Sequence, residues 1–416
     1  MSKSPEELYE ERLKRVHDAV QLKVPDRVPF TPFFTFFWAK YSGMSCREAM
    51  YDYDGLAKAG KKAILDFEPD MYNNPFAMLA LGPLMETLDS RQFKWPGHGV
   101  SQDHTYQFVE EEHMKAEDYD DFLFDPTDYL LRTFIPKIFG TLEPFQQLPS
   151  LPSLYYTRAL TATAVFGNPA VAGAVQSLLT AGAEALHMIG KMMAFAKDMK
   201  DLGFPSQAGA AAYAPLDYLG DFLRGTRGVL MDMLRVPDKL QEVLEKIIPI
   251  ILRGAIPAAK ASGNPFVFMP MHKCPDEFMS VDHFKTFFWP SLRKVILSLI
   301  EEDLIPVVLW EGNCESRLEI IREIPRGKAI YWFEQTDLVK VKEIMGDTVC
   351  IRGNVPPVLL ITGSVREVED YCKNLIDHVG KDGGFIMDGA IGIPDEAKPE
   401  NVKAMADITR TYGVYG

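Results

Sequence analysis

The chain has 416 residues, a formal net charge of −14 at pH 7, 47% hydrophobic residues and 25% charged residues. This is an ordinary globular balance, and the length suits one enlarged domain as well as two smaller ones. Lys and Arg are dispersed along an acidic chain, so we expect neither a nucleic-acid partner nor an anionic membrane surface.

The N-terminus and the cysteines predict a cytoplasmic protein. The first residues, MSKSPEELYEERLKRV, carry charges where a secretory peptide needs an apolar core, and no run approaches the ~20 apolar residues of a membrane span. The five cysteines are odd in number and widely spaced, which does not fit a disulfide framework. A special cysteine would therefore be a metal ligand or a reactive thiol.

The N-terminal half predicts a strand, a helix and then an interruption. An aromatic run at 27–38 is typical of a first strand, a helix is expected at 46–66, and a short strand near Met71 follows. The stretch 81–155 breaks the alternation, and we interpret it as an insertion that could cover the site or form a subunit contact. Beyond it, long helices at 168–200 and 237–262 flank an expected strand at 207–214.

The last 150 residues repeat one pattern of a buried strand followed by a helix. The expected strands are 265–271, 305–310, 328–333, 348–353 and 384–389, and helices are expected to begin near Ser280, Ser316, Asp337, Ser364 and Pro399. Such strands require a parallel sheet with crossover helices, in a barrel or a doubly wound sheet. Eight strands is the natural count. We therefore predict an α/β fold, a (β/α)8 TIM barrel, as one domain over 1–416 with the insertion at 81–155.

A polar residue directly follows the apolar run of each strand in this series, at the end where barrel enzymes carry their chemistry. Each has a structural alternative: His272 could bond a loop backbone, Glu334 could cap the helix near Asp337 or pair with a lysine, and Asn354 could shape a turn. Apolar walls around such groups shift their pKa values. The candidate catalytic residues are Glu311, His272, Asp388 and Glu334, with Asn354 as a substrate-binding candidate.

Two further groups bear on ligands. His272, Glu311 and Cys314 could together offer zinc a nitrogen, oxygen and sulfur ligand set, although free cysteines are more often buried hydrophobes. The aromatic residues after the first strand would line a barrel mouth suited to an apolar or aromatic ligand, or would pack under the insertion. These candidate substrate-binding residues are Phe34, Phe36 and Trp38, together with Trp310 before Glu311.

Four motifs resemble the uroporphyrinogen decarboxylase superfamily: VPDRVPF (24–30), FKTFFWPSLRKVI (284–296), RGNVPPVLLITGSVREVEDYCKNLI (352–376) and IGIPDEAKPENVKAM (391–405). The resemblance implies a (β/α)8 barrel. The decarboxylases of this superfamily carry an arginine-rich signature after the first strand, where this chain has FFTFFWAKYSG. Phenylalanines hold a polycarboxylate poorly, so the resemblance favours the second branch of the superfamily.

That branch resembles methylcobamide:coenzyme M methyltransferases, whose zinc-binding H-x-C falls here on Trp310-Glu311-Gly312. It implies a demethylase that passes a methyl group from a small substrate, such as an aryl methyl ether, to a corrinoid protein. Glu311 and His272 would polarise the leaving atom and Asp388 would orient them. No cobalamin-binding D-x-H-x-x-G occurs, so the cobalamin would arrive on a partner protein. The alternatives are a cofactor-free decarboxylase using Asp388 or Glu311, and a non-catalytic binder. A homodimer is the default oligomer.

Overall fold

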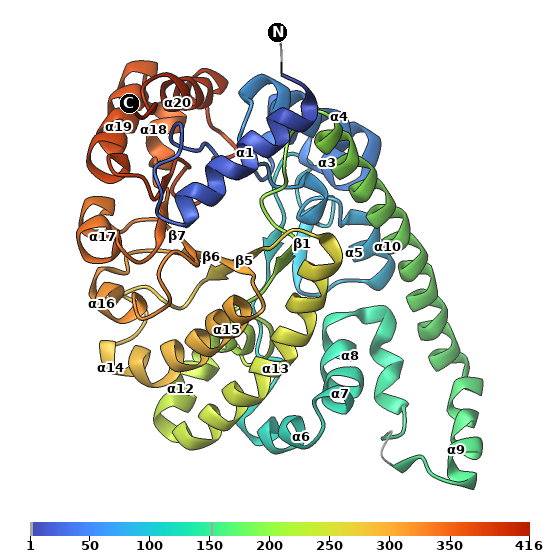
Figure 1. The fold of residues 1–416 in the computed structure, drawn as a ribbon. Helices are drawn as coiled ribbons and strands as arrows, with labels where there is room; N and C mark the ends of the chain where they lie inside the picture. Colours follow the sequence, from blue (N-terminus) through green and yellow to red (C-terminus); the bar gives the residue numbers. More distant parts are fainter. Residues whose placement is uncertain (1–2, 151–152) are drawn as a thin grey trace.

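A computed structural model describes residues 3–150 and 153–416. Residues 1–2, and 151–152 within the predicted insertion, lie outside the described residues. Six parallel strands form the main sheet in the order β4-β5-β6-β7-β8-β9 (Figure 1). The strands are β4 (Ala210–Ala211), β5 (Phe266–Met271), β6 (Ile305–Trp310), β7 (Ile330–Phe333), β8 (Cys350–Arg352) and β9 (Phe385–Ile386).

Helices follow the strands and cover the outside of the sheet (Figure 1). Their bounds are α1 (Pro5–Val20), α2 (Phe37–Tyr41), α3 (Cys46–Tyr51), α4 (Tyr53–Phe67), α5 (Gly82–Leu88), α6 (Tyr119–Phe124), α7 (Pro126–Tyr129), α8 (Ile135–Ile138), α9 (Thr157–Thr161), α10 (Pro169–Asp201), α11 (Pro215–Asp217), α12 (Thr226–Arg235), α13 (Pro237–Ser262), α14 (Val281–His283), α15 (Trp289–Glu301), α16 (Leu318–Ile321), α17 (Leu338–Met345), α18 (Pro357–Thr362), α19 (Val365–Leu375) and α20 (Pro399–Thr411).

The strand-helix alternation of the C-terminal half is confirmed. Ser280 and Asp337 cap α14 and α17 with their side chains, and Ser364 forms the expected capping box with Glu367 at the start of α19. The long helices expected at 168–200 and 237–262 are α10 and α13. Local sequence signals were strong here because strand and helix each have clear periodicity and caps.

The N-terminal expectations need correction. Residues 27–38 form only isolated bridges, and α2 begins at Phe37. The helix expected at 46–66 is divided at Asp52, which ends α3 and caps α4 with its side chain. A side chain that caps a new helix competes with continuation of the old one, and this overrode the apolar periodicity.

Two segments link the edges of the sheet. Phe30 forms a β-bridge with Met387, just after β9. The carbonyl of Phe30 accepts a hydrogen bond from the Asp70 N–H at 2.8 Å. Tyr72 then bridges Ser206, just before β4. Backbone hydrogen bonds therefore run from β9 through residues around 30 and 70 to β4, although both segments are too short to count as strands.

Side chains alternate between two faces of each strand. In β5, Val267, Met269 and Met271 are fully buried in the cluster that includes the outer helices, whereas Phe268 is half-buried on the other, inner face. By the same alternation, the residues that follow the strands are at inner-face positions. They are His272, Glu311, Glu334, Asn354 and Asp388.

Helix α1 closes the amino ends of the strands. Its Val16, Ala19 and Val20 form one buried cluster with the first inner-face residues of the sheet. Those residues are Phe266, Val307, Ile330, Cys350 and Ile386. The inner face is therefore sealed at this end by an apolar plug.

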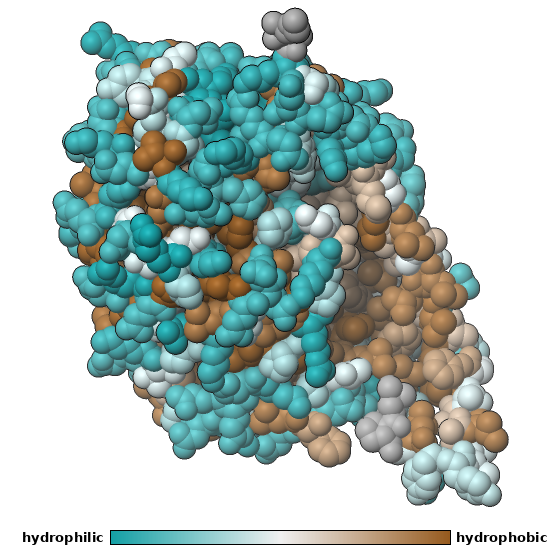
Figure 2. Space-filling model, in the orientation of Figure 1, coloured by the Kyte–Doolittle hydropathy of each residue, from teal (hydrophilic) through white to brown (hydrophobic). Residues whose placement is uncertain are grey.

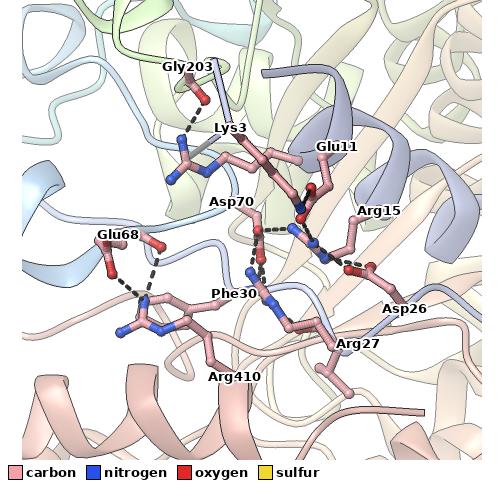
Figure 3. A network of polar contacts seen from close by, with 12 residues as sticks. Lys3, Glu11, Arg15, Asp26, Arg27, Phe30, Glu68, Asp70, Gly203 and Arg410 are labelled. Carbon is pink, nitrogen blue, oxygen red and sulfur yellow. Dashed lines mark hydrogen bonds and ion pairs between the residues drawn. The ribbon is translucent and has the colours of Figure 1, made fainter. Parts of the chain in front are cut away.

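A network of ion pairs fixes this plug to the chain around it (Figure 3). Asp70 is fully buried and accepts hydrogen bonds from Arg15, from both terminal nitrogens of Arg27 and from the Phe30 N–H, at 2.6–2.8 Å. Arg15 also binds Asp26 through two nitrogens. Asp26 and Arg27 belong to the VPDRVPF motif, so that motif is structural here. We call Arg15, Asp26, Arg27 and Asp70 the Asp70 network.

A small sheet lies within the predicted insertion. Strands β1 (Phe93–Pro96), β2 (Gly99–Val100) and β3 (Gln107–Phe108) pair in the order β2-β1-β3. Phe108 contacts Phe222 with ring centroids 6.2 Å apart, and the His113 and Met114 N–H groups both donate to the Leu223 carbonyl. This segment is therefore anchored to the turn that follows β4.

No helix in the described residues 3–150 and 153–416 is long and apolar enough to cross a membrane.

Candidate active site

Two carboxylates and two cations meet at the carboxyl end of β5. The His272 Nδ1 lies 2.6 Å from Asp221 Oδ2, and Lys273 Nζ contacts the other oxygen of Asp221. Asp217 accepts hydrogen bonds from the backbone N–H groups of His272 and Lys273 at 3.1 and 2.9 Å. Together with Glu311, these residues form what we call the His272 cluster.

The positions of Asp217 and Asp221 follow from local helical geometry. α11 continues into a π-helical turn at Tyr218–Leu223, so two carboxylates four residues apart share one side of it. Burial raises the pKa of Asp217 and the nearby Asp221 charge raises it further. Burial opposes ionisation of Asp221 too, but His272 and Lys273 outweigh it and lower its pKa. Asp221 is therefore the carboxylate that holds the His272 charge.

His272 is held as a cation with its outer nitrogen directed away from Asp221. Burial disfavours the charge, but the Asp221 hydrogen bond and the Glu311 and Asp217 charges raise its pKa to about 9. Its Nε2 lies 3.6 Å from Glu311 Oε1, which is too long for a hydrogen bond. The side chains of His272 and Glu311 remain 36% and 27% exposed, so a substrate atom can reach both.

Glu311 and Glu334 follow neighbouring strands, and their charges interact. Burial raises the pKa of Glu311, the His272 charge lowers it and the Glu334 charge raises it, with a net result of about 6. Glu334 accepts a 2.6 Å hydrogen bond from the Gly312 N–H. The Asn354 amide donates to the carbonyls of Glu334 and Thr336 at 3.3 and 3.0 Å. Glu334 thus shapes the Glu311 loop and Asn354 shapes the next one; the cap of α17 is Asp337 itself.

Asp388 belongs to a different group of side chains, so its expected role in orienting His272 and Glu311 is wrong. It is fully buried and accepts hydrogen bonds from Arg352 at 2.8 and 3.0 Å and from the Gly389 and Phe33 N–H groups. Burial raises its pKa to about 6 although Arg352 opposes this. The Arg352 guanidinium also lies 4.1 Å above the Trp332 ring.

The predicted zinc ligands do not converge. Cys314 Sγ lies 3.6 Å from Cys274 Sγ and 3.6 Å from the Glu311 carbonyl, beneath the loop. All five cysteines are buried and unpaired. Within residues 3–150 and 153–416, no three His, Cys, Asp or Glu side chains are arranged to hold a metal. The described donor set therefore does not fit a zinc ion.

The aromatic residues chosen from the first strand lie in the core, which corrects their prediction as a mouth. The alternative, packing against residues 81–155, holds for Phe36, which contacts Tyr106. Phe34 stacks on Phe37 and packs against Trp38, with both of their side chains buried. Phe36 is buried against Tyr106, and Trp310 has the outer parity and packs on Tyr331. Strand alternation explains the outward position of Trp310 in β6, whereas Phe37 and Trp38 lie in α2 and not in a strand.

Other aromatic rings occupy the inner face. Phe33 is half-buried and contacts Phe268 and Trp332, with ring centroids 5.4 and 5.6 Å apart. Phe222, next to Asp221, contacts Tyr213 at 5.2 Å. These five rings supply the apolar surroundings that the sequence assigned to Phe34, Phe36, Trp38 and Trp310.

This architecture and its polar strand ends define a parallel α/β protein with an enzyme-like site. The family model described as uroporphyrinogen decarboxylase (URO-D) matches residues 162–412, and the chain belongs to this family. The match covers the sheet from β4 onward and the whole His272 cluster.

Individual relatives are distant. A uroporphyrinogen decarboxylase from Chlorobium phaeovibrioides is 23% identical over 137 residues, 32% of this chain and 38% of the relative. One from Rickettsia felis is 31% identical over 134 residues, 32% of this chain and 37% of the relative. The aligned part therefore spans less than two fifths of these curated relatives.

A methyltransferase from Methanosarcina mazei shares the fold, with a TM-score of 0.63 at 14% identity over 96% of this chain and 98% of that one. At this identity the likeness concerns the fold. It extends along nearly the whole chain, beyond the region that the family model matches.

Sequence reasoning missed Asp217, Asp221, Lys273 and Arg352. Lys273 stands inside the H-x-C motif, and Arg352 stands in the RGN motif at a buried strand position. The sequence PLDYLGDFL, with two acids four residues apart after a predicted strand, was the available signal for Asp217 and Asp221.

Proposed function

We propose that this enzyme demethylates a small methylated substrate, with an aryl methyl ether as the best fit, and passes the methyl group to a corrinoid protein. The observation that carries the proposal is the geometry of His272, whose Nδ1 is held by Asp221 and whose Nε2 is reachable and not hydrogen-bonded to Glu311. A general acid must be protonated at the operating pH and acidic enough to give its proton to the leaving group. A donor with a pKa of about 9 suits a phenolate leaving group, since phenols titrate near ~10.

In this mechanism the methyl carbon-oxygen bond breaks and its electron pair stays on oxygen. His272 gives its Nε2 proton to that oxygen, and the neutral phenol results. Asp221 holds the ring through Nδ1 and stabilises its cationic form beforehand. Glu311, mostly ionised at pH 7, faces Nε2 and favours the cation, and Lys273 balances the charge of Asp221.

The corrinoid, carried by the partner protein, supplies the nucleophile that accepts the methyl group. Because the described side chains do not provide a three-ligand metal set, no step in the proposal uses zinc.

We propose that the substrate binds at the inner face of the sheet. We take the linked segments around residues 30 and 70 as the remaining strands of a (β/α)8 barrel. Phe33 and Phe268, which are half-buried and lie next to the buried ring of Trp332, would stack on an aromatic substrate. The small sheet β1–β3, anchored at Phe222 and Leu223, would limit access of water to the His272 cluster.

Cofactor-free decarboxylation is the second candidate, favoured by the names of the relatives. His272 and Glu311 could protonate a carbanion after loss of carbon dioxide. This role needs cations to hold the remaining carboxylates, and Arg352 at the inner face is already bound to Asp388. The arrangement therefore supports methyl transfer better.

One assay separates the two. The protein is incubated with aryl methyl ethers, methylated amines or methyl thioethers and free reduced cobalamin, and demethylated product is measured by chromatography. We expect product from an aryl methyl ether, lost in His272→Ala. Cobalamin-independent release of carbon dioxide from a porphyrinogen carboxylic acid, without demethylation, would replace the proposal with decarboxylation.

A further inference from the structure

Helix α10 is apolar on two sides, and only one of them is covered. Its 33 residues extend about 50 Å at 1.5 Å per residue. One side packs on the chain through buried Val171, Ala174, Ala181, Phe195 and Met199. An apolar helix surface that faces away from its own core is expected to be covered by something else.

The uncovered side carries a regular apolar stripe. Leu179, Gly182, Leu186, Ile189 and Met193 follow one another at steps of three and four residues, the spacing of a coiled-coil contact line. The side chains of Leu179, Leu186 and Met193 are 62%, 72% and 64% exposed. We call these five residues the α10 seam.

The seam continues into an apolar tip at α9 and the residues beside it. Tyr155, Tyr156, Leu160 and Phe166 are all exposed there. Figure 2 shows the resulting apolar surface along the right side, over α10 and toward α9. The exposed large apolar side chains of seam and tip amount to on the order of 1,000 Å², at roughly 200 Å² for each full side chain. The largest patch on a monomer is usually about 300–600 Å².

Charge distinguishes this surface from the rest of the chain. The chain carries a net charge of −14, which repels a second copy, yet between Glu143 and Glu184 the only charged residue is Arg158. Gly182 adds a second sign of contact: an added Cβ there would meet nothing within 4 Å. Gly173 and Gly190 of the same helix are equally open. A glycine in mid-helix costs helix stability, and at Gly182, within the seam, it would allow a second helix to approach closely.

We infer that the α10 seam and its tip form a permanent homodimer interface in which α10 packs against α10 of a second copy. A stable interface needs roughly 800 Å² from each partner, which the apolar area supplies. Interfaces that open and close are more polar than permanent ones. A carrier protein that binds transiently would expose this apolar surface to water each time it dissociated, whereas a second copy would cover it permanently. A two-fold axis makes the same seam serve both protomers.

The test is the mass of the full chain in solution. Light scattering after gel filtration should give twice 46.9 kDa for the wild type and 46.9 kDa for the double variant Leu179→Lys, Leu186→Lys. The matched control is Leu234→Lys, Val358→Lys, at residues that are 69% and 66% exposed away from the seam, and it should remain a dimer. Since all four side chains are exposed, the substitutions leave the folded core intact.

Position-specific evidence comes from cross-linking. Because the native cysteines are buried, Leu186→Cys at the centre of the seam should give a disulfide-linked dimer under mild oxidation, and Leu234→Cys should not. A monomeric wild type, a dimeric seam variant, or a monomer that binds phosphatidylcholine vesicles through this surface would each overturn the inference.

Discussion

The Asp70 network and the His272 cluster lie at opposite ends of the parallel sheet, and each joins two or more carboxylates to two cations. Around Asp70 every contact is a direct hydrogen bond, with the carboxylate fully buried and both arginines fixed by it. In the His272 cluster one contact is incomplete, because Nε2 of His272 and Glu311 are 3.6 Å apart and both side chains are partly exposed.

The difference separates a structural role from a chemical one. A saturated buried ion pair holds segments together and has no capacity left for a ligand. A charged group with one unused donor, a shifted pKa and solvent access is poised for reaction. Charge and burial alone therefore do not distinguish the two groups; the solvent-accessible Nε2 of His272, which makes no hydrogen bond to Glu311, does.

The largest expected effect is on catalysis at His272. His272→Ala should lower kcat/KM about 10²- to 10⁴-fold, the usual contribution of a positioned proton donor. Kinetics of demethylation measure the activity, and a denaturant unfolding curve measures the stability of the same variant. His378→Ala, at an exposed histidine in the turn after α19, is the control and should leave both unchanged. Equal activity of the two variants would remove His272 from the mechanism.

The next effect is on stability at Asp70. Asp70→Ala leaves two arginines without their shared carboxylate and should cost about 3–5 kcal/mol of unfolding free energy, measured by urea denaturation. Asp66→Ala, in an exposed pair with Lys62, should cost no more than about 1 kcal/mol. A small loss at Asp70 would contradict the structural role given to its network.

A smaller and more selective effect is expected at Asp221. Asp221→Asn removes the charge that holds the His272 cation, so the pKa of His272 should fall from about 9 toward its ordinary value. The alkaline limb of the pH-rate profile should move to lower pH by the same amount, which NMR titration of the imidazole can follow. An unmoved alkaline limb would mean that another group sets it.

The smallest effect concerns stability against pH. The folded pKa of His272 is raised, so its stabilising contribution is complete below about 6.5, the value of an unperturbed histidine, and is lost as pH rises toward about 9. Unfolding free energies at pH 6.5 and pH 9 should therefore differ more for the wild type than for His272→Gln. An identical pH dependence in the variant would show that other groups carry it.

The C-terminal half was predictable because its signals are local. Each strand is a short apolar run, and α14, α17 and α19 begin at side-chain caps. The first polar residue after each apolar run lies at the carboxyl end of the strand. His272 and Glu311 were found in this way, and the structure brings them together. The partners of these residues could not be found from local signals, because Asp221 approaches His272 from a turn 51 residues earlier in the chain.

The prediction of the aromatic substrate-binding residues failed for a different reason. Phe33 and Phe34 are adjacent and chemically identical in the sequence, yet one faces Trp332 on the inner face and the other packs against Trp38. A shift of one residue in strand register exchanges the two faces. Since residues 27–38 form bridges and not a full strand, their alternation had no regular element from which to be counted.

The apolar plug of α1 has a consequence for the order of events in the proposed reaction. With the amino ends of the strands sealed by Val16, Ala19 and Val20, the carboxyl ends remain as the route to the inner face. A small molecule and a macromolecular carrier would share that single entrance. The small substrate must then enter before the carrier docks, and its product leaves after the carrier departs, which gives steady-state kinetics with compulsory-order binding.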